Sequence, residues 1–217
     1  MNTVHYGLRR EESIIDVLGT FPFLSSSLIR RQIFEDVSDR MAQRVLTRMH
    51  KRKMLKRFRY GQEYIYHIVA KNQKWKHWLE VARFHFAMME GLANWQVILD
   101  YKVEKHLGFC VTDIYYKMIY KPGDIREIYV EVDRGSHMLQ FGKYPESYTV
   151  ILVVSRKLRV NIPDNWIVTS IEEVQKHGIR LGSENRKVND KWFQGVSEKA
   201  EEETTKSSFF QQGKSIR

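Results

Sequence analysis

Apolar residues recur at helical spacing in three segments near the N-terminus. The first predicted helix lies in REESIIDVLGTF and ends at Gly19. A second, short helix follows with Ser25 or Ser26 as its N-cap, and a third begins after Ser38 and ends near Lys53. The apolar stripe of the third helix consists of Ala42, Val45, Leu46 and Met49.

The segment LKRFRYGQEYIYHIV then indicates two aromatic-rich strands that are broken at Gly61 and Gln62, as in a β-hairpin. Three helices followed by a hairpin is the order of a winged helix-turn-helix, which we place at residues 9–70. Residues 71–94 are predicted to form a linking helix that joins this unit to the rest of the chain. Its apolar face would contain Trp75, Trp78, Leu79, Ala82, Phe86 and Met89.

Strand patterns dominate residues 95–181. WQVILDYKV is one candidate strand, and TDIYYKMIY turns through KPGD into a third strand, IREIYVEVD. YTVILVVS is almost wholly apolar, which is typical of a strand buried on both faces, and TSIEEVQKHG indicates a short capped helix. We therefore predict a small α/β domain at 95–181, a polar and disordered tail at 182–217, and an α+β fold class overall.

Charge narrows the choice of partners. The chain has a net charge of +10 and a sequence pI of about 9.6, a balance that favours polyanions such as nucleic acid. Residues 28–60 contain eleven Lys and Arg but three Asp and Glu, so most of the excess lies in the helical unit. No apolar run approaches the ~18 residues of a membrane span. The single cysteine, Cys110, rules out an internal disulfide and favours a cytoplasmic location.

Polar side chains of the third helix fall opposite its apolar stripe, at a spacing that suits a DNA major groove. Arginine and glutamine can make paired contacts to base edges, whereas the other cations would hold phosphates. A solvated basic face, a protein contact, RNA and a membrane surface are the alternatives. The predicted DNA-binding residues are Arg40, Gln43, Arg44, Thr47, Arg48 and Lys51 on the helix, with Arg57 and Arg59 on the hairpin.

A second candidate site lies on the strand EIYVEVD. Glu131 and Asp133 are two residues apart and therefore point to the same side. Asp113 begins the preceding strand and would approach Glu131 if the two strands pair. Two such carboxylates are the ligands that Mg²⁺ prefers, so Asp113 and Glu131 are candidate metal ligands, and Asp113, Glu131 and Asp133 are candidate catalytic residues. No other cofactor is expected, because the chain has no phosphate-binding loop and no trusted zinc spacing.

Several of these segments together resemble the replication-relaxation family of plasmids, phages and integrative elements. The resemblance covers about residues 9–175. Its motifs are YGQEYIYHI, WLEVARFHFAM, TDIYYKM, and YVEVDRGSHML followed by KYPESYTVILVV. It implies a winged helix, a linking helix and a restriction-endonuclease-like domain in a DNA-binding protein of a mobile element.

The second domain is similar to the nuclease pattern of Asp followed by Glu-x-Lys. Asp113 and Glu131 match the two acids, but Asp133 stands where an active enzyme usually has lysine. Arg134 or Lys143 could reach in to replace that lysine, or could pair with Glu131 and Asp133 in a purely structural role. We favour a nuclease-like scaffold that lacks full catalytic equipment and is kept for DNA or partner binding.

The sequence therefore predicts a cytoplasmic protein that binds double-stranded DNA. It would act as a replication or transfer accessory factor or as a transcriptional regulator, together with replication, transfer or transcription proteins. A homodimer formed through the helix at 72–94 is a further hypothesis. A metal-dependent nuclease and a protein-interaction adaptor are the alternatives from other functional classes.

Overall fold

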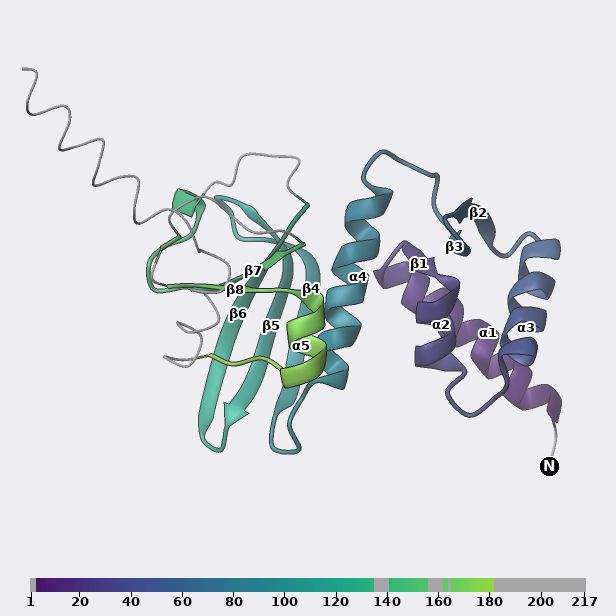
Figure 1. The fold of residues 1–217 in the computed structure, drawn as a ribbon, viewed down its shortest axis with the longest axis horizontal. Helices are drawn as coiled ribbons and strands as arrows, with labels where there is room; N and C mark the ends of the chain where they lie inside the picture. The colour runs from purple at the N-terminus through teal and green to yellow at the C-terminus, as the bar shows by residue number, and fades with distance from the viewer. Residues whose placement is uncertain (1–2, 135–140, 156–161, 164, 182–217) are drawn as a thin grey trace, which may run out of the picture.

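The computed structural model describes residues 3–134, 141–155, 162–163 and 165–181, with side chains from residue 9 onward. It is an α+β structure, as predicted (Figure 1). The first part of the chain contains α1 (Thr3–Thr20), β1 (Phe23–Ser25), α2 (Ser26–Ile33), α3 (Asp39–Lys51), β2 (Lys56–Tyr60), β3 (Glu63–His67) and α4 (Trp75–Glu90). The second part contains β4 (Val97–His106), β5 (Val111–Lys121), β6 (Asp124–Asp133), the 3-10 helix η1 (Phe141–Lys143), β7 (Thr149–Val154), β8 (Trp166–Thr169) and α5 (Ile171–His177).

Side-chain caps fix the starts of the two helices that precede the hairpin. The hydroxyl oxygen of Ser25 accepts a hydrogen bond from the amide of Leu28 at 3.2 Å, and that of Ser38 accepts one from Met41 at 3.4 Å. Each bond satisfies one amide that the helix itself leaves without a partner. The hairpin turns at Gly61, whose φ of 59° falls in the left-handed region. These positions confirm both predicted caps and the predicted turn.

The hairpin belongs to a three-stranded antiparallel sheet in the order β1-β3-β2. β1 is only three residues long and pairs Leu24 with Tyr66, which ties the chain before α2 to the hairpin after α3. The two faces of this sheet differ. Tyr66 lies in the core with the helices α1 to α3, whereas Ile65 packs with Leu79 of α4. The hairpin is therefore held between the helical bundle and α4.

The larger sheet has five strands in the order β4-β5-β6-β7-β8. β4, β5 and β6 are antiparallel neighbours, and β6, β7 and β8 run parallel. One face, which includes Ile128 and Val130, is buried beneath α4 and α5. The other face buries Tyr129 and Leu152 beneath η1 and the residues that follow it. The alternation predicted for β6 is thus confirmed, but both of its faces are buried.

Helix α4 lies between the helical unit and the larger sheet (Figure 1). Eight of its residues are buried, and it contacts β1, β6 and α5. One hydrophobic cluster runs from Ile14 and Leu18 of α1 through Phe84 of α4 to Val130 of β6. Most of the apolar face predicted for this helix is therefore buried within the chain, although Met89 is 44% exposed.

Several boundaries differ from the predictions. α1 begins at Thr3, earlier than expected, and α4 is shorter than the predicted 71–94. The strands β1 and β8 were not predicted, because three or four residues are too few to show an alternating pattern. The predicted tail at 182–217 lies outside the described residues. Among the helices that are described, none has the length and apolar character needed to cross a bilayer.

Candidate nucleic-acid interface

Helix α3 buries one apolar stripe and exposes most of its polar residues, although Met41 in its first turn is 45% exposed. Ala42, Val45, Leu46 and Met49 are buried. On the opposite side, Arg40, Gln43, Arg44 and Lys51 are exposed and Thr47 is half-buried. The structure therefore brings the predicted helix residues together on one surface. Arg52 joins them, and the shared open groove is lined by Arg40, Gln43, Arg44, Thr47, Arg48, Lys51 and Arg52.

Arg48 has a partner within the chain, the carboxylate of Glu11 on α1. Its Nε and Nη2 atoms donate hydrogen bonds to Oε1 of Glu11 at 2.9 and 2.5 Å. Arg52 Nη1 lies 3.8 Å from the second carboxylate oxygen, and Glu11 itself is only 4% exposed. Glu11 thus joins α1 to α3 and holds two arginines at one edge of the groove. Sequence reasoning assigned Arg48 to DNA alone and missed Glu11.

A pattern in the sequence pointed to Glu11. It stands three residues before Ile14 and seven before Leu18, so it shares their buried helical face. An acidic residue on a buried stripe needs a charged or hydrogen-bonding partner, because a lone buried carboxylate is costly. In the structure that partner is Arg48 of the basic helix α3.

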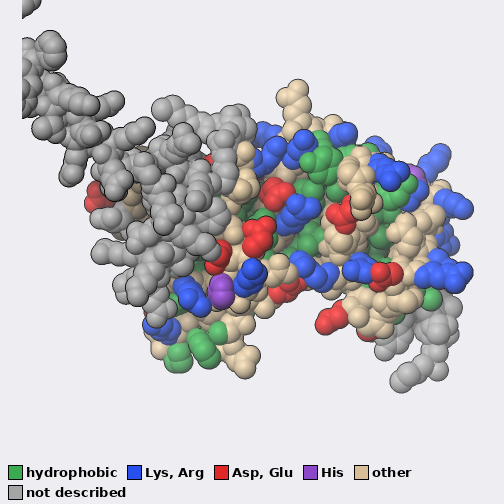
Figure 2. All heavy atoms as spheres, in the orientation of Figure 1, with side chains coloured by type: hydrophobic (Ala, Val, Ile, Leu, Met, Phe, Trp, Pro, Cys, Tyr) green, Lys and Arg blue, Asp and Glu red, His purple; other side chains and the backbone are tan. Residues whose placement is uncertain are grey.

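The hairpin arginines lie on the sheet face that is turned toward the helical bundle. Arg57 is paired in register with Tyr66, and its guanidinium carbon lies 4.2 Å from the ring centroid of Tyr64. The Nε atom of Arg59 donates a hydrogen bond to the carbonyl oxygen of Gly61 at 3.3 Å. Arg57 is half-buried and its Nη1 atom donates a hydrogen bond to the hydroxyl of Tyr66 at 3.4 Å, whereas Arg59 is exposed. Figure 2 shows Lys and Arg side chains gathered at the edge of the molecule where α3 and the hairpin lie.

Asp113 and Glu131 are neighbours across β5 and β6. Ile114 pairs with Val130 in the antiparallel ladder, so the next residues, Asp113 and Glu131, stand opposite each other. Asp113 Oδ2 accepts a hydrogen bond from the Val132 amide at 2.7 Å, and its Oδ1 lies 2.9 Å from Nε2 of His77 on α4. The predicted approach of the two carboxylates is thus present.

Lys143 of η1 completes this cluster. Its Nζ atom lies 2.8 Å from Oε2 of Glu131, and the hydroxyl of Tyr144 donates a hydrogen bond to Oε1. Burial raises the pKa of Glu131, as does the nearby charge of Asp113, while Lys143 and Tyr144 act in the opposite direction. A lysine therefore does reach the acid pair, but from a segment after β6 rather than from the position of Asp133.

These contacts leave little room for a metal ion. Both oxygens of Asp113 and both oxygens of Glu131 already have partners within the chain. Within the part of the chain that is described, no group of three or more His, Cys, Asp or Glu side chains is arranged to hold a metal. Carboxylates are suitable ligands for Mg²⁺, but here an ion would have to displace His77 or Lys143. As described, the cluster is a hydrogen-bonded ion-pair network.

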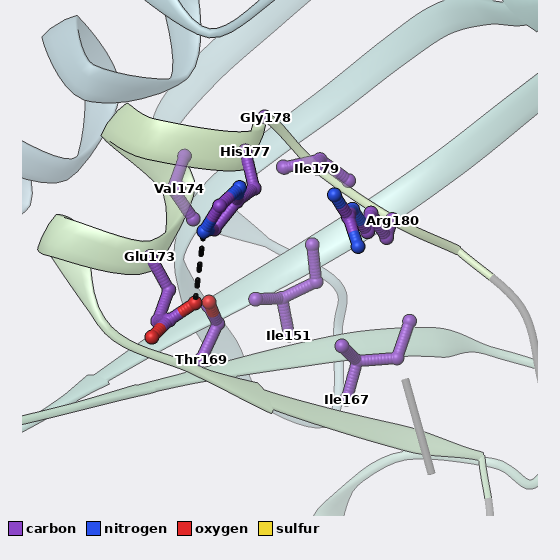
Figure 3. Close-up of a pocket in the computed structure, with 9 residues that line it drawn as sticks. All are labelled: Ile151, Ile167, Thr169, Glu173, Val174, His177, Gly178, Ile179 and Arg180. Atoms are coloured by element: carbon purple, nitrogen blue, oxygen red, sulfur yellow. Dashed lines mark ion pairs between the residues drawn. The ribbon is translucent and has the colours of Figure 1, made fainter. Parts of the chain in front are cut away.

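A small pocket that shares no residue with either candidate site lies beneath α5 (Figure 3). Ile151 and Ile167 form its floor, and Glu173 and His177 lie 3.9 Å apart at its rim. Its cavity volume of about 30 Å³ accommodates little more than a water molecule. We assign no ligand to it.

Comparison with known proteins does not identify a ligand or substrate for either site. No protein-family model, no curated protein and no solved structure matches this chain. The replication-relaxation resemblance remains a prediction from sequence motifs, and the groove on α3 is the feature that carries a functional proposal.

Proposed function

We propose that this chain binds double-stranded DNA through α3 and the hairpin, in the manner of a winged helix-turn-helix. The observation that carries the proposal is the exposed row formed by Arg40, Gln43 and Arg44, with Thr47 and Lys51 continuing it along one groove. A helix whose other face is buried is rigid enough to present such residues to base edges.

The hairpin supports the same proposal. Its arginines, Arg57 and Arg59, lie on the sheet face turned toward the helices, so they extend the positive surface beside α3. Phosphate contacts from such residues position a protein on the duplex, and base contacts from the helix supply specificity. Arg48 has a smaller part in this proposal, because Glu11 already holds it.

The biological role rests on the sequence resemblance. We propose a DNA-binding protein of a mobile element, which serves as a replication or transfer accessory factor or as a transcriptional regulator. The larger domain would be a nuclease-like scaffold that helps to bind DNA or a protein partner. The mixed five-stranded sheet supports this second part.

Duplex binding is tested by fluorescence anisotropy with a labelled DNA duplex. Arg40→Ala/Arg44→Ala should weaken binding at least about ten-fold, since each lost cation contributes about 1 kcal/mol or more. The matched control is Lys102→Ala/Lys176→Ala, which removes the same charge from exposed positions on β4 and α5. Equal weakening in both variants would show that binding depends on net charge and would contradict a specific surface on α3.

A metal-dependent nuclease is the second candidate function, favoured by the position of Lys143 beside Glu131 and Asp113. It requires His77 and Lys143 to release the carboxylates when a metal ion and DNA bind. Cleavage of supercoiled plasmid DNA in Mg²⁺ or Mn²⁺ should then disappear in Asp113→Asn and Glu131→Gln, but persist in Glu172→Gln on the exposed side of α5. Equal cleavage in all variants would indicate a contaminant and would remove this candidate.

A further inference from the structure

The hairpin carries a second positive surface, made of aromatic rings and lysines. We define this aromatic-basic surface as Phe58, Tyr60, Lys71, Trp75 and Lys76. The ring of Trp75 stands edge-on to Phe58 at 4.9 Å and to Tyr60 at 4.8 Å, centroid to centroid. The Nζ atom of Lys71 lies 4.0 Å from the centroid of Phe58, and that of Lys76 lies 5.3 Å from the centroid of Tyr60.

The charge and exposure of the aromatic-basic surface suit a polyanion that carries planar aromatic bases. Residues 56–60 and 71–78 contain six Lys and Arg and no Asp or Glu. Tyr60 is 46% exposed, and Lys71 and Lys76 are exposed as well. Trp75 is half-buried and packs near Leu79, so the platform is fixed to α4. A rigid aromatic platform flanked by exposed cations is the arrangement that binds unpaired bases and their phosphates.

This surface lies on the other face of the hairpin from the proposed duplex site. Phe58 pairs in register with Ile65, which packs with α4, whereas Arg57 pairs with Tyr66, which packs with the helical bundle. Tyr60 has the same strand parity as Phe58, so it shares that face. A duplex that contacts α3, Arg57 and Arg59 would therefore leave the aromatic-basic surface exposed.

We propose that the aromatic-basic surface binds single-stranded nucleic acid. Bases stack on Tyr60 and the accessible part of Trp75, and Lys71 and Lys76 hold the phosphates on either side. Duplex bases cannot use this surface, because they are already stacked on their neighbours. The surface thus gives the protein a site for an unpaired strand that is separate from the site for the duplex.

The test is fluorescence anisotropy of the full chain with a labelled oligothymidylate of about 16 nucleotides. Tyr60→Ala should weaken binding at least about five-fold, the lower range for loss of one stacked base. Tyr60→Phe should bind oligothymidylate as tightly as the wild-type protein, because stacking requires the ring and not the hydroxyl. Lys71→Ala/Lys76→Ala should also weaken it. A thermal unfolding curve checks that each variant is folded.

Two further arms separate stacking from charge and identify the strand. An abasic oligonucleotide of the same length should bind several-fold more weakly than oligothymidylate, and equal affinity would overturn the proposal. Oligouridylate is compared with oligothymidylate, and the tighter binder shows whether the preferred strand is RNA or DNA. Failure of both to bind would overturn the proposal.

The outcome is independent of duplex binding. Arg44→Ala should weaken duplex binding and leave oligothymidylate binding within about two-fold, and Tyr60→Ala should do the reverse. If Tyr60→Ala weakens both equally, the hairpin serves one shared site and the separate single-strand site is wrong.

Discussion

The carboxylate of Glu11 on α1 accepts two hydrogen bonds from the guanidinium group of Arg48 on α3, both at the same oxygen atom. Glu11 is buried, while the side chain of Arg48 is 46% exposed. The same helix therefore uses Arg48 to fasten α1 to α3 and leaves Arg44 exposed. Folding and DNA binding should respond differently to changes at these two arginines.

We expect Arg48→Ala to lower the free energy of unfolding by about 1.5–3 kcal/mol, because it removes two charge-assisted hydrogen bonds and leaves a buried carboxylate with poorer partners. Arg44→Ala, its matched control on the exposed face, should change stability by less than about 0.5 kcal/mol. Urea unfolding followed by circular dichroism measures both. Equal stability of the two variants would mean that the Glu11 contact contributes nothing to the fold.

Gly178 is expected to be intolerant of any side chain. It has a φ of +66°, and an added Cβ would lie 2.3 Å from the carbonyl oxygen of Gly91. Gly123 has a φ of +79° but open space around it, so Gly123→Ala incurs the backbone cost alone, about 1–2 kcal/mol. Gly178→Ala should therefore lower the unfolding free energy by clearly more than Gly123→Ala. Similar losses would contradict the close approach of the ends of α4 and α5.

The free energy of unfolding should decrease at acidic pH because His85 is buried. Burial lowers the pKa of this side chain to about 4, and its Nδ1 atom lies 2.9 Å from the hydroxyl of Tyr116. The ordinary pKa is higher, about 6.5, so the unfolded chain binds the proton first as the pH falls. The contribution of His85 to the free energy of unfolding is therefore fully present above about pH 6.5. It is lost progressively as the pH falls toward 4, by at most about 3 kcal/mol.

The measurement is the free energy of unfolding in urea between about pH 4.5 and pH 7. His85→Asn, which cannot take up a proton in this range, is the control for titration by carboxylates elsewhere. The wild-type protein should lose more stability than the variant over this interval. Parallel pH profiles would show that His85 is protonated equally in the folded and unfolded states.

Lys143 should govern the titration of Glu131. Burial and Asp113 raise the pKa of this carboxyl group, and the ammonium group at 2.8 Å opposes them. Lys143→Met should raise the pKa of Glu131 further, whereas Lys102→Met on β4 should leave it unchanged. Carboxyl-carbon NMR of glutamate-labelled protein reports the titration. A lower pKa in Lys143→Met would contradict the ion pair.

Local signals in the sequence were sufficient for much of the fold. Ser38 caps α3 as its position before a periodic segment predicted, and Gly61 lies at the predicted hairpin turn. TSIEEVQKHG forms the predicted short capped helix, with Ser170 as its N-cap. These features depend on neighbouring residues alone. The stripe that leaves Arg44 exposed is of the same kind, because helical periodicity fixes which residues share a face.

Contacts between distant segments were harder to predict. Lys143 reaches Glu131 from a 3-10 helix whose position no periodicity indicates. The sequence therefore offered Lys143 only as one alternative beside Arg134, and could not fix which of them reaches the acid. Arg48 was assigned to DNA because its partner, Glu11, is 37 residues away. A pairing of this kind depends on how two helices pack, which a single sequence does not specify.

The most direct test of the central proposal is the salt dependence of duplex binding by the wild-type protein and by Arg40→Ala/Arg44→Ala. Affinity should fall steeply with salt in both proteins, because Arg57, Arg59 and Lys51 still hold phosphates, and the variant should bind at least about ten-fold more weakly at each salt concentration. Flat, weak binding by both proteins would contradict a DNA-binding role for α3.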